Sequence, residues 1–379
     1  MQKPYTLIIP SWYPTSSQPL NGIFIEKHVE AISSFENVVV MYVTGAEKES
    51  VEEKKISGSY VRYSHFYAES SSRFVNQIKY VLSQKKAYAH ITAKYGKPSV
   101  LHLQVVFPAG IFVYLLLLFR NIPLIITEHW SGYTDEDGRY QRQMSVFKYL
   151  TKVLFAKAKK ISVVSNYLKN AMVQKGLANE KKLMIVSNML NTADKSVVQE
   201  PISSTKALYI GNLNDHEKNI TMLIEAVEIV VQRYPNFELT LIGGGSEIVR
   251  FKELAAQKEL LDKHIFFKGY VPNTELSPYY QANSFFILTS NFETFNIAAA
   301  EAMLCGLPVV ATQCGGPAEF VNEHTGIWIK EKTTQETATA IITMIEKRSS
   351  FDSKSIATEV MRKYSHETII GELKDLYQL

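Results

Sequence analysis

Two glutamates lie eight residues apart in a stretch that could hold a ligand between them. The stretch Thr289–Val310 reads TSNFETFNIAAAEAMLCGLPVV; Glu293 precedes a run of strong helix formers, and Glu301 lies within that run. A helix that opens after a strand turns free N–H groups and its positive dipole end toward the sheet edge, where a diphosphate can bind. Carboxylates accept hydrogen bonds from sugar hydroxyls. The pattern suits a sugar-diphosphate site, but two glutamates alone are more often part of an ordinary amphipathic helix with Glu301 on its solvated face.

The elements around these glutamates are expected to be strand, loop, helix and strand. Ser284–Leu288 is a short apolar run typical of a buried strand. Asn296–Cys305 contains no helix breaker, and Gly306 and Pro308 end the helix before another short strand. The helix therefore begins close to Glu293, which belongs to the loop before it.

Five residues receive expected roles from this arrangement. The amides of Phe295, Asn296 and Ile297 would face the phosphates at the helix start. Glu293 would reach toward the group that the phosphate carries, and Glu301 toward sugar hydroxyls on the nucleoside side.

Apolar runs of strand length alternate with helical patterns along the whole chain. The expected strands are Tyr5–Pro10, Val38–Val43, Val100–Leu103, Leu124–Thr127, Ile161–Ser165, Met184–Val186, Ala207–Ile210, Glu238–Ile242, His264–Phe267, Ser284–Leu288, Pro308–Ala311 and Ile327–Ile329. Such alternation predicts an α/β fold with two Rossmann-like, doubly wound parallel sheets that are covered by helices on both faces.

The length and one change of composition predict two domains. A chain of 379 residues is too long for one ordinary core. Apolar periodicity is lost over residues 188–203, which reads as a linker. The predicted domains are residues 1–190 and 204–363, and residues 364–379 form a terminal helix.

Two residues of the first domain are candidates for a ligand site because each follows an expected strand. Gly22 ends a loop before a helix and would let the backbone approach a ligand closely. The alternative is a plain connection between strand and helix. His129 lies in the segment 127–132 at the same edge of the sheet. A histidine in such a place is more often a structural hydrogen-bonding residue.

The segment Tyr140–Lys182 is strongly basic. It holds ten lysines and arginines against a single acid, Glu180, although the net charge of the chain is only +4. A solvated basic helix face is one interpretation. Attraction to an anionic membrane surface is the other, since each Lys or Arg near such a surface contributes about 1 kcal/mol.

Several classes of protein are not expected. Two cysteines are too few for a disulfide framework, so a reducing, cytoplasmic compartment is expected. No signal peptide is expected, because the first residues, MQKPYTLIIP, lack a long enough apolar core. No spanning helix is expected, because the longest apolar stretch, Val105–Phe119, is below the ~20 residues that cross a bilayer. No nucleic-acid motif accompanies the basic residues. Asp135 and Asp137 form a possible metal-binding pair, but without a third ligand nearby we interpret them as an acidic, mobile loop and predict neither metal nor other cofactor.

The stretch around the two glutamates resembles the donor-site signature of retaining glycosyltransferases of family 4. The resemblance rests on Glu293, Glu301 with Ala302 and Met303, Gly306, Pro308–Val310 and Gly315–Gly316. It implies a GT-B architecture, in which two Rossmann-like domains face a cleft and the terminal helix packs back on the first domain. It also implies metal-independent transfer of a sugar, with retention, from a UDP- or GDP-sugar to a glycan or a lipid-linked glycan.

The resemblance implies roles for other residues. The glycine-containing loop at Gly22 would face the donor phosphate, and the backbone near Val271 would meet the nucleotide base. Lys218 would grip the diphosphate, and His129 would lie near the transferred sugar. The family usually has an arginine where this chain has Asn212, and an amide supplies no charge to the leaving group. A catalytically silent nucleotide-sugar-binding protein is therefore an alternative, and a sugar-nucleotide epimerase on the same architecture is another.

Overall fold

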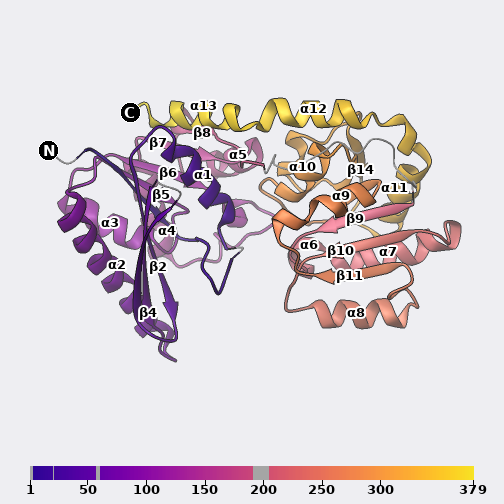
Figure 1. Ribbon diagram of the computed structural model, residues 1–379, viewed down its shortest axis with the longest axis horizontal. Coiled ribbons are helices and arrows are strands. Elements are labelled where there is room, and N and C mark those ends of the chain that lie inside the picture. Colours follow the sequence, from indigo (N-terminus) through magenta and orange to yellow (C-terminus); the bar gives the residue numbers. More distant parts are fainter. Residues whose placement is uncertain (1–2, 20, 57–59, 191–204) are drawn as a thin grey trace. The chain divides into compact units, whose positions relative to one another are not determined.

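The computed structural model describes residues 3–19, 21–56, 60–190 and 205–379. It divides into two compact units, one of Met1–Met189 with His366–Leu379 and the other of Leu190–Ser365. Each unit is built on its own largely parallel sheet, so the prediction of two α/β sheets is confirmed (Figure 1). Most of the predicted linker, residues 191–203, lies outside the described residues.

The sheet of the first unit has the strand order β3-β4-β2-β1-β5-β6-β7-β8. Its strands are β1 (Thr6–Pro10), β2 (Val38–Ala46), β3 (Ser50–Ile56), β4 (Tyr60–Ala68), β5 (Val100–Gln104), β6 (Leu124–Glu128), β7 (Lys160–Val163) and β8 (Leu183–Ile185). All pairs are parallel except β3 with β4. The sequence analysis missed β3 and β4. β3 is a mostly exposed edge strand that carries Glu52, Glu53, Lys54 and Lys55 in place of an apolar run. β4 is only partly buried and mixes Arg62, Ser64 and His65 with its aromatic residues, so it also lacks an apolar run.

Helices cover both faces of this sheet. They are α1 (Ile23–Ser33), α2 (Arg73–Tyr95), α3 (Gly110–Phe119), α4 (Ser145–Lys157), α5 (Asn166–Gln174) and α13 (His366–Tyr377). α1 and α13 pack together on the face that carries Ile8 and His102, where the hydroxyl of Tyr377 lies 2.7 Å from His102 Nδ1. α3 packs against Leu103 on the opposite face, with α2 and α4 as its neighbours.

The predicted end of one strand was wrong for a clear local reason. The expected strand Ile161–Ser165 stops at Val163, because Ser165 is the N-cap of α5 and its side chain accepts a hydrogen bond from the amide of Leu168.

The sheet of the second unit has the order β11-β10-β9-β12-β13-β14, and all its pairs are parallel. The strands are β9 (Lys206–Ile210), β10 (Glu238–Ile242), β11 (Ile265–Gly269), β12 (Phe285–Leu288), β13 (Val309–Thr312) and β14 (Gly326–Ile329). From β9 the sheet continues through β10 to β11 on one side and through β12 and β13 to β14 on the other. The order therefore reverses between β9 and β12, and the crevice at such a switch point is where doubly wound sheets bind ligands.

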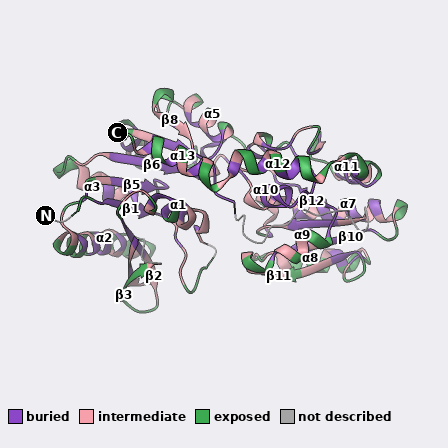
Figure 2. Ribbon diagram, turned by 45° about the horizontal axis from the view of Figure 1, so that its top comes forward, coloured by how far each residue is buried: buried purple, intermediate pink, exposed green. Residues whose placement is uncertain are grey.

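The helices of the second unit are α6 (Asp215–Lys218), α7 (Ile220–Arg233), α8 (Ile248–Gln257), α9 (Ser277–Ala282), α10 (Ile297–Leu304), α11 (Thr334–Lys347) and α12 (Ser353–Tyr364). Their apolar sides and the sheet form a buried core, which Figure 2 shows as purple ribbon around the strands. α8 ends at Gln257, and Glu259 just beyond it has a left-handed φ of 58° that a helix cannot accommodate.

Candidate functional site

The start of α10 is fixed by its N-cap residue. Asn296 has a φ of 75°, a left-handed conformation that Asn tolerates better than most residues. Its side-chain oxygen accepts a hydrogen bond of 2.8 Å from the amide of Ala299, and its side-chain NH₂ donates one of 2.8 Å to Glu293. One side chain thus caps the helix and orients the carboxylate in front of it.

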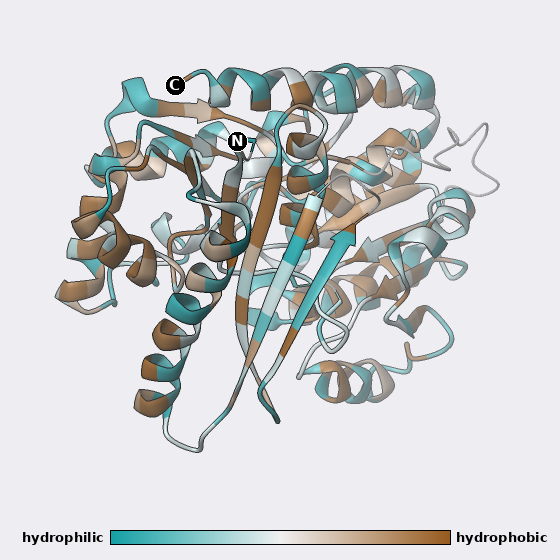
Figure 3. Cartoon of the chain, turned by 60° about the vertical axis from the view of Figure 1, so that its left-hand side comes forward, coloured by the Kyte–Doolittle hydropathy of each residue, from teal (hydrophilic) through white to brown (hydrophobic). Residues whose placement is uncertain are grey.

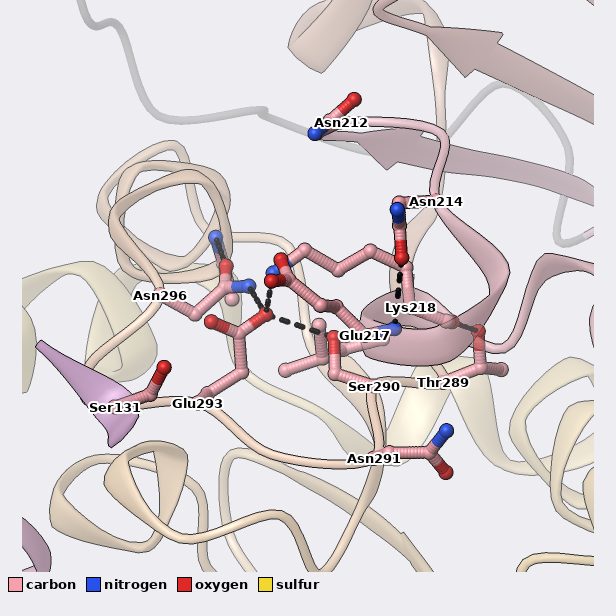
Figure 4. A network of polar contacts seen from close by, with 12 residues as sticks. Ser131, Asn212, Asn214, Glu217, Lys218, Thr289, Ser290, Asn291, Glu293 and Asn296 are labelled. Carbon is pink, nitrogen blue, oxygen red and sulfur yellow. Dashed lines mark hydrogen bonds and ion pairs between the residues drawn. The ribbon is translucent and has the colours of Figure 1, made fainter. Parts of the chain in front are cut away.

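Glu293 is held through one of its two carboxylate oxygens (Figure 4). Its Oε1 accepts hydrogen bonds from Lys218 Nζ and Ser290 Oγ, both at 2.7 Å, and from the Asn296 side chain. Its Oε2 accepts no hydrogen bond from any residue that the structure describes. The carboxylate is therefore fixed in orientation while one oxygen stays available to a ligand hydroxyl.

The sheet explains why Lys218 and Glu293 meet across 75 residues of sequence. β9 and β12 are neighbours, so the loops that leave their carboxyl ends lie side by side. The hydroxyl of Thr289 donates to the carbonyl of Lys218 at 2.9 Å, and the amide of Asn291 donates to the carbonyl of Glu217 at 2.8 Å. These bonds fix the lysine-bearing turn to the strand-exit loop that carries Glu293.

Asp215 supports the same turn from behind. Its carboxylate accepts hydrogen bonds from the amide and hydroxyl of Thr221 and forms an ion pair of 2.9 Å with Arg250. Burial raises the pKa of Asp215, but its bonds to Thr221 and the nearby Arg250 outweigh that and hold the pKa below its ordinary value. A charged Asp215 therefore locks α6, which ends at Lys218.

The Lys218–Glu293 ion pair is well shielded from solvent, with side chains only 15% and 11% exposed. Burial by itself lowers the pKa of Lys218, whereas the Glu293 carboxylate and the hydrogen bond to it raise the pKa, and the net result lies above the ordinary value. Lys218 is consequently a permanent cation at this sheet edge.

The amides of Phe295, Asn296 and Ile297 donate no hydrogen bond within the described chain, as expected for the open end of a helix. The Phe295 side chain is buried against Phe320 and Tyr364, which anchors the backbone at this point.

Glu301 lies in α10, as predicted, and only 1% of it is exposed. The alternative of a solvated helix face is therefore wrong. Tyr280 donates a hydrogen bond of 3.4 Å to its carboxylate, and the carboxylate raises the pKa of this already buried tyrosine further.

Asn212 stands apart from the cluster. It is exposed, and Figure 4 shows its side chain away from Lys218 and Glu293. His216, which could replace the missing arginine as a cation, is also exposed, and its ring lies 5.7 Å from that of Phe292.

The sequence analysis missed Lys332, which follows β14. Its Nζ donates a hydrogen bond of 2.5 Å to the carbonyl of Asn291, and its charge is felt by the buried thiol of Cys314, next to Glu293. A second ammonium thus lies at the loop before α10, and no motif near residue 332 pointed to it.

Val271 follows β11 and is half-buried beside the exposed Tyr270. Gly269 before them has a φ of 68° and its carbonyl accepts a hydrogen bond of 2.8 Å from the amide of Gly243. Gly243 and Gly245 themselves abut the β9 exit loop, since a Cβ on either would lie 1.8 or 2.2 Å from a carbonyl oxygen. These two glycines serve close packing of adjacent strand-exit loops.

In the first unit, His129 is a buried, neutral side chain. It lies 4.6 Å from the ring of Phe24, and its Nε2 is 3.4 Å from the amide oxygen of Gln104. Burial, followed by the neighbouring His28 and His102, lowers the pKa of His129 far below its ordinary value. Its Nδ1 has no partner among the described residues, which leaves one acceptor for a ligand or a water.

Gly22 is the N-cap of α1 with a φ of 71°. A Cβ there would lie 2.6 Å from the carbonyl of Trp12, so the glycine is required by the fold of its own loop. Its position at the carboxyl edge of β1 is as expected.

The interpretation of Asp135 and Asp137 as a mobile acidic loop was wrong for Asp137. That residue is buried and binds Ser131 and Arg139 at 2.6 Å, while exposed Asp135 pairs with Lys175. Among the described residues, no three His, Cys, Asp or Glu side chains are placed to hold a metal ion.

Several lysines of the basic segment 140–182 are bound by acids or carbonyl groups, and one of these acids, Asp135, lies outside the segment. Lys175 pairs with Asp135 and Lys169 with Glu180, and Lys160 and Lys182 donate to backbone carbonyls. Within the described chain, no helix is long and apolar enough to cross a membrane.

Comparison with known families gives two adjoining matches. The profile described as glycosyl transferases group 1 matches residues 192–364, and that described as glycosyltransferase family 4 matches residues 36–194. The putative teichuronic acid biosynthesis glycosyltransferase TuaC of Bacillus subtilis is 25% identical over 374 residues, which cover 88% of this chain and 87% of the relative.

Solved structures share the fold of the whole chain. Sucrose-phosphate synthase from Thermosynechococcus elongatus superposes with a TM-score of 0.80 at 20% identity, over 99% of this chain and 98% of the other. Anabaena Alr3699/HepE in complex with UDP and glucose has a TM-score of 0.72 at 15% identity, over 98% of both chains. At these identities the likeness establishes the architecture alone, which is that of the GT-B glycosyltransferases.

Proposed function

Since this chain belongs to the glycosyltransferases of group 1 and family 4, we propose that it moves a sugar from a nucleotide-diphosphate sugar to a hydroxyl acceptor with retention at the anomeric carbon. One observation carries the proposal: Glu293 is anchored through Oε1 by Lys218 in front of α10, and its Oε2 is left to bind a ligand.

The proposed donor lies with its diphosphate at the start of α10. The amides of Phe295, Asn296 and Ile297 and the ammonium of Lys218 would stabilise the charge that grows on the diphosphate as the glycosidic bond breaks. A UDP- or GDP-sugar is the donor class that we propose, and the UDP and glucose bound in the HepE structure support it.

The sugar would be oriented by Glu293 Oε2 through a hydroxyl hydrogen bond, and the ribose by Glu301. The acceptor hydroxyl attacks from the face that the diphosphate leaves, and a phosphate oxygen takes its proton. No side-chain nucleophile and no metal takes part. For His129 we propose the role of a neutral hydrogen-bonding group for the transferred sugar.

The proposed acceptor is a glycan or a lipid-linked glycan handled at the cytoplasmic side of a membrane. TuaC, a relative described as acting in teichuronic acid biosynthesis, supports a polysaccharide-type acceptor.

Donor screening followed by a transfer assay tests the proposal. Thermal shift against a panel of UDP- and GDP-sugars identifies the donor, since a ligand at 100-fold its Kd stabilises by about 2.7 kcal/mol. Release of nucleoside diphosphate and the anomeric configuration of the product are then measured. An inverted product, or binding with neither hydrolysis nor transfer, contradicts the proposal.

The exposed Asn212 favours a second candidate, a silent nucleotide-sugar-binding protein. Asn212→Arg discriminates between the two. It would raise turnover in an active enzyme, whereas a silent protein would bind the donor more tightly without product.

A further inference from the structure

The helices α2, α3 and α4 form a layer on one face of the first unit's sheet. α3 packs between the other two, with ring contacts from Tyr88 to Phe112 and from Phe107 to Phe147. Their outward sides are unusually apolar. Of the sixteen large hydrophobic residues that are exposed in the described chain, eleven lie on or just before these three helices: Phe74, Val75, Ile78, Leu82, Phe107, Leu115, Leu118, Phe119, Met144, Val146 and Tyr149.

The spacing of these residues gives each helix one apolar outward side. Phe74, Ile78 and Leu82 recur every four residues along α2. Leu115 and Leu118 share a side of α3, and Phe119 beside them is 81% exposed. Figure 3 shows brown, hydrophobic segments on the helices at the left of that view. Scattered exposed apolar residues are normal, but a concentration on three adjacent helices marks an interaction surface.

Charge sets this layer apart from ordinary apolar surface. None of the three helices contains an Asp or Glu, and the sequence holds no acid at all from Ser70 to Thr127. Lys86 and Lys94 of α2 pair with Glu49 and Glu53, whereas five other exposed basic residues on the layer form no ion pair with a described residue: Arg73, Lys85, Arg120, Lys152 and Lys157. Helices α7, α8, α11 and α12 of the second unit all mix acids with their bases.

We propose that the outward side of α2–α4, here the α2–α4 face, docks on an anionic lipid bilayer. The interface of an anionic bilayer binds surfaces that combine apolar side chains with unpaired basic ones. The aromatic and leucine side chains would enter the headgroup region, and the basic groups would contact lipid phosphates. A second copy of this chain fits worse, because two like-charged faces would meet. The inference differs from the expectation for the basic segment 140–182. α4 is the part of that segment that belongs to the α2–α4 face, and two of the segment's other lysines, Lys169 and Lys175, are paired with acids.

The inference does not rest on the transfer reaction, so it is tested without a donor. The full chain is sedimented with vesicles of phosphatidylcholine alone and with vesicles that contain a third of phosphatidylglycerol. We expect at least tenfold tighter binding to the anionic vesicles, and loss of that preference at high salt.

Matched variants locate the docking surface. Lys152→Glu with Lys157→Glu should weaken binding at least tenfold, whereas Lys330→Glu with Lys354→Glu, equally exposed on the second unit, should not. Leu118→Ser with Phe119→Ser should also weaken binding at least tenfold. In Phe119→Trp, the tryptophan fluorescence should shift to the blue on binding to the anionic vesicles and should be quenched when these contain brominated lipids.

Three results would overturn the inference. Equal affinity for both vesicle types would do so. Binding that the serine variant leaves unchanged would mean a site for polyanions in general. Sedimentation of the free chain as a dimer, converted to monomer by the serine variant, would assign the face to self-association.

Discussion

Two groups of positive charge in this protein are balanced in opposite ways. At the start of α10, Lys218 is enclosed and bonded to Glu293, and the pair lies in a set of hydrogen bonds. On the α2–α4 face, five basic side chains stand exposed among apolar ones without acidic partners in the described chain, namely Arg73, Lys85, Arg120, Lys152 and Lys157. An enclosed, paired charge can hold a defined geometry for chemistry. Exposed basic side chains without acidic partners are instead available to anionic groups outside the molecule.

The largest effect is expected at the enclosed pair. Glu293→Gln keeps the size and an acceptor for Ser290 and Asn296, but places an NH₂ group where Oε2 would accept a ligand hydroxyl. We expect kcat to fall by roughly 10²–10³, the loss typical of a preorganised polar group in an active site. Turnover is measured with the donor that the thermal-shift screen identifies.

Glu323→Gln is the matched control, since that carboxylate is 86% exposed. It should leave kcat unchanged. If Glu293→Gln transfers sugar at the rate of the unaltered protein, Glu293 has no catalytic part.

The buried histidines of the first unit are neutral, unlike the paired Lys218 and the exposed basic residues. Burial lowers the pKa of His28 to about 4, and burial followed by the charge of His28 lowers that of His102 to about 3. The unfolded chain, with an ordinary value of 6.5, binds protons first as pH falls, so stability is full above pH 6.5 and is lost below it. Glu128 changes stability with pH in the opposite direction. Burial raises its pKa to about 7, so it contributes stability that is lost as pH rises through that value.

His28, His102 and His129 are three neutral histidines against Glu128, and we expect these four groups together to cost roughly 2–4 kcal/mol of stability between pH 6.5 and pH 5, at about 1.4 kcal/mol per pH unit for each net proton. Hydrogen exchange of amides in β1 and β5 at the two pH values measures the loss. His28→Gln should reduce the slope by one proton, while His324→Gln on the surface should not. A flat profile would contradict the assignment of neutral histidines.

The fold was predictable from sequence because buried parallel strands are short apolar runs between helical patterns. β3 and β4 escaped, since β3 is rich in Glu and Lys and β4 interrupts its aromatic residues with Arg62, Ser64 and His65. In the site, Glu293 and Glu301 stood out by type and spacing, and Lys218 was identified through the resemblance to family 4. Lys332 did not, because only the order of strands in the sheet brings the loop after β14 toward that before α10. The α2–α4 face escaped for a similar reason, since exposure is decided by packing between helices.

A smaller effect is expected at the cap of α10. Asn296→Ala removes the cap and the donor to Glu293, and it also forces a Cβ residue into a left-handed φ of 75°. We expect a loss of roughly 2 kcal/mol in the free energy of unfolding, about half from the cap and half from the backbone. Asn296→Gly keeps the positive φ and should cost clearly less in urea unfolding. Equal losses in the two variants would mean that the backbone conformation is not a source of strain.

The smallest effect on stability is expected for an apolar residue of the α2–α4 face, in contrast to one of the core. Leu115 is 41% exposed on α3, so Leu115→Ala should change the free energy of unfolding by no more than about 0.5 kcal/mol. Leu223 is fully buried in α7, so Leu223→Ala should lower the free energy of unfolding by about 2–5 kcal/mol, because the substitution leaves a cavity. Urea unfolding of both variants measures the contrast. A large loss at Leu115 would mean that this side chain packs within the unit, and the apolar layer would then belong to the core of the fold and have no free surface to offer a bilayer.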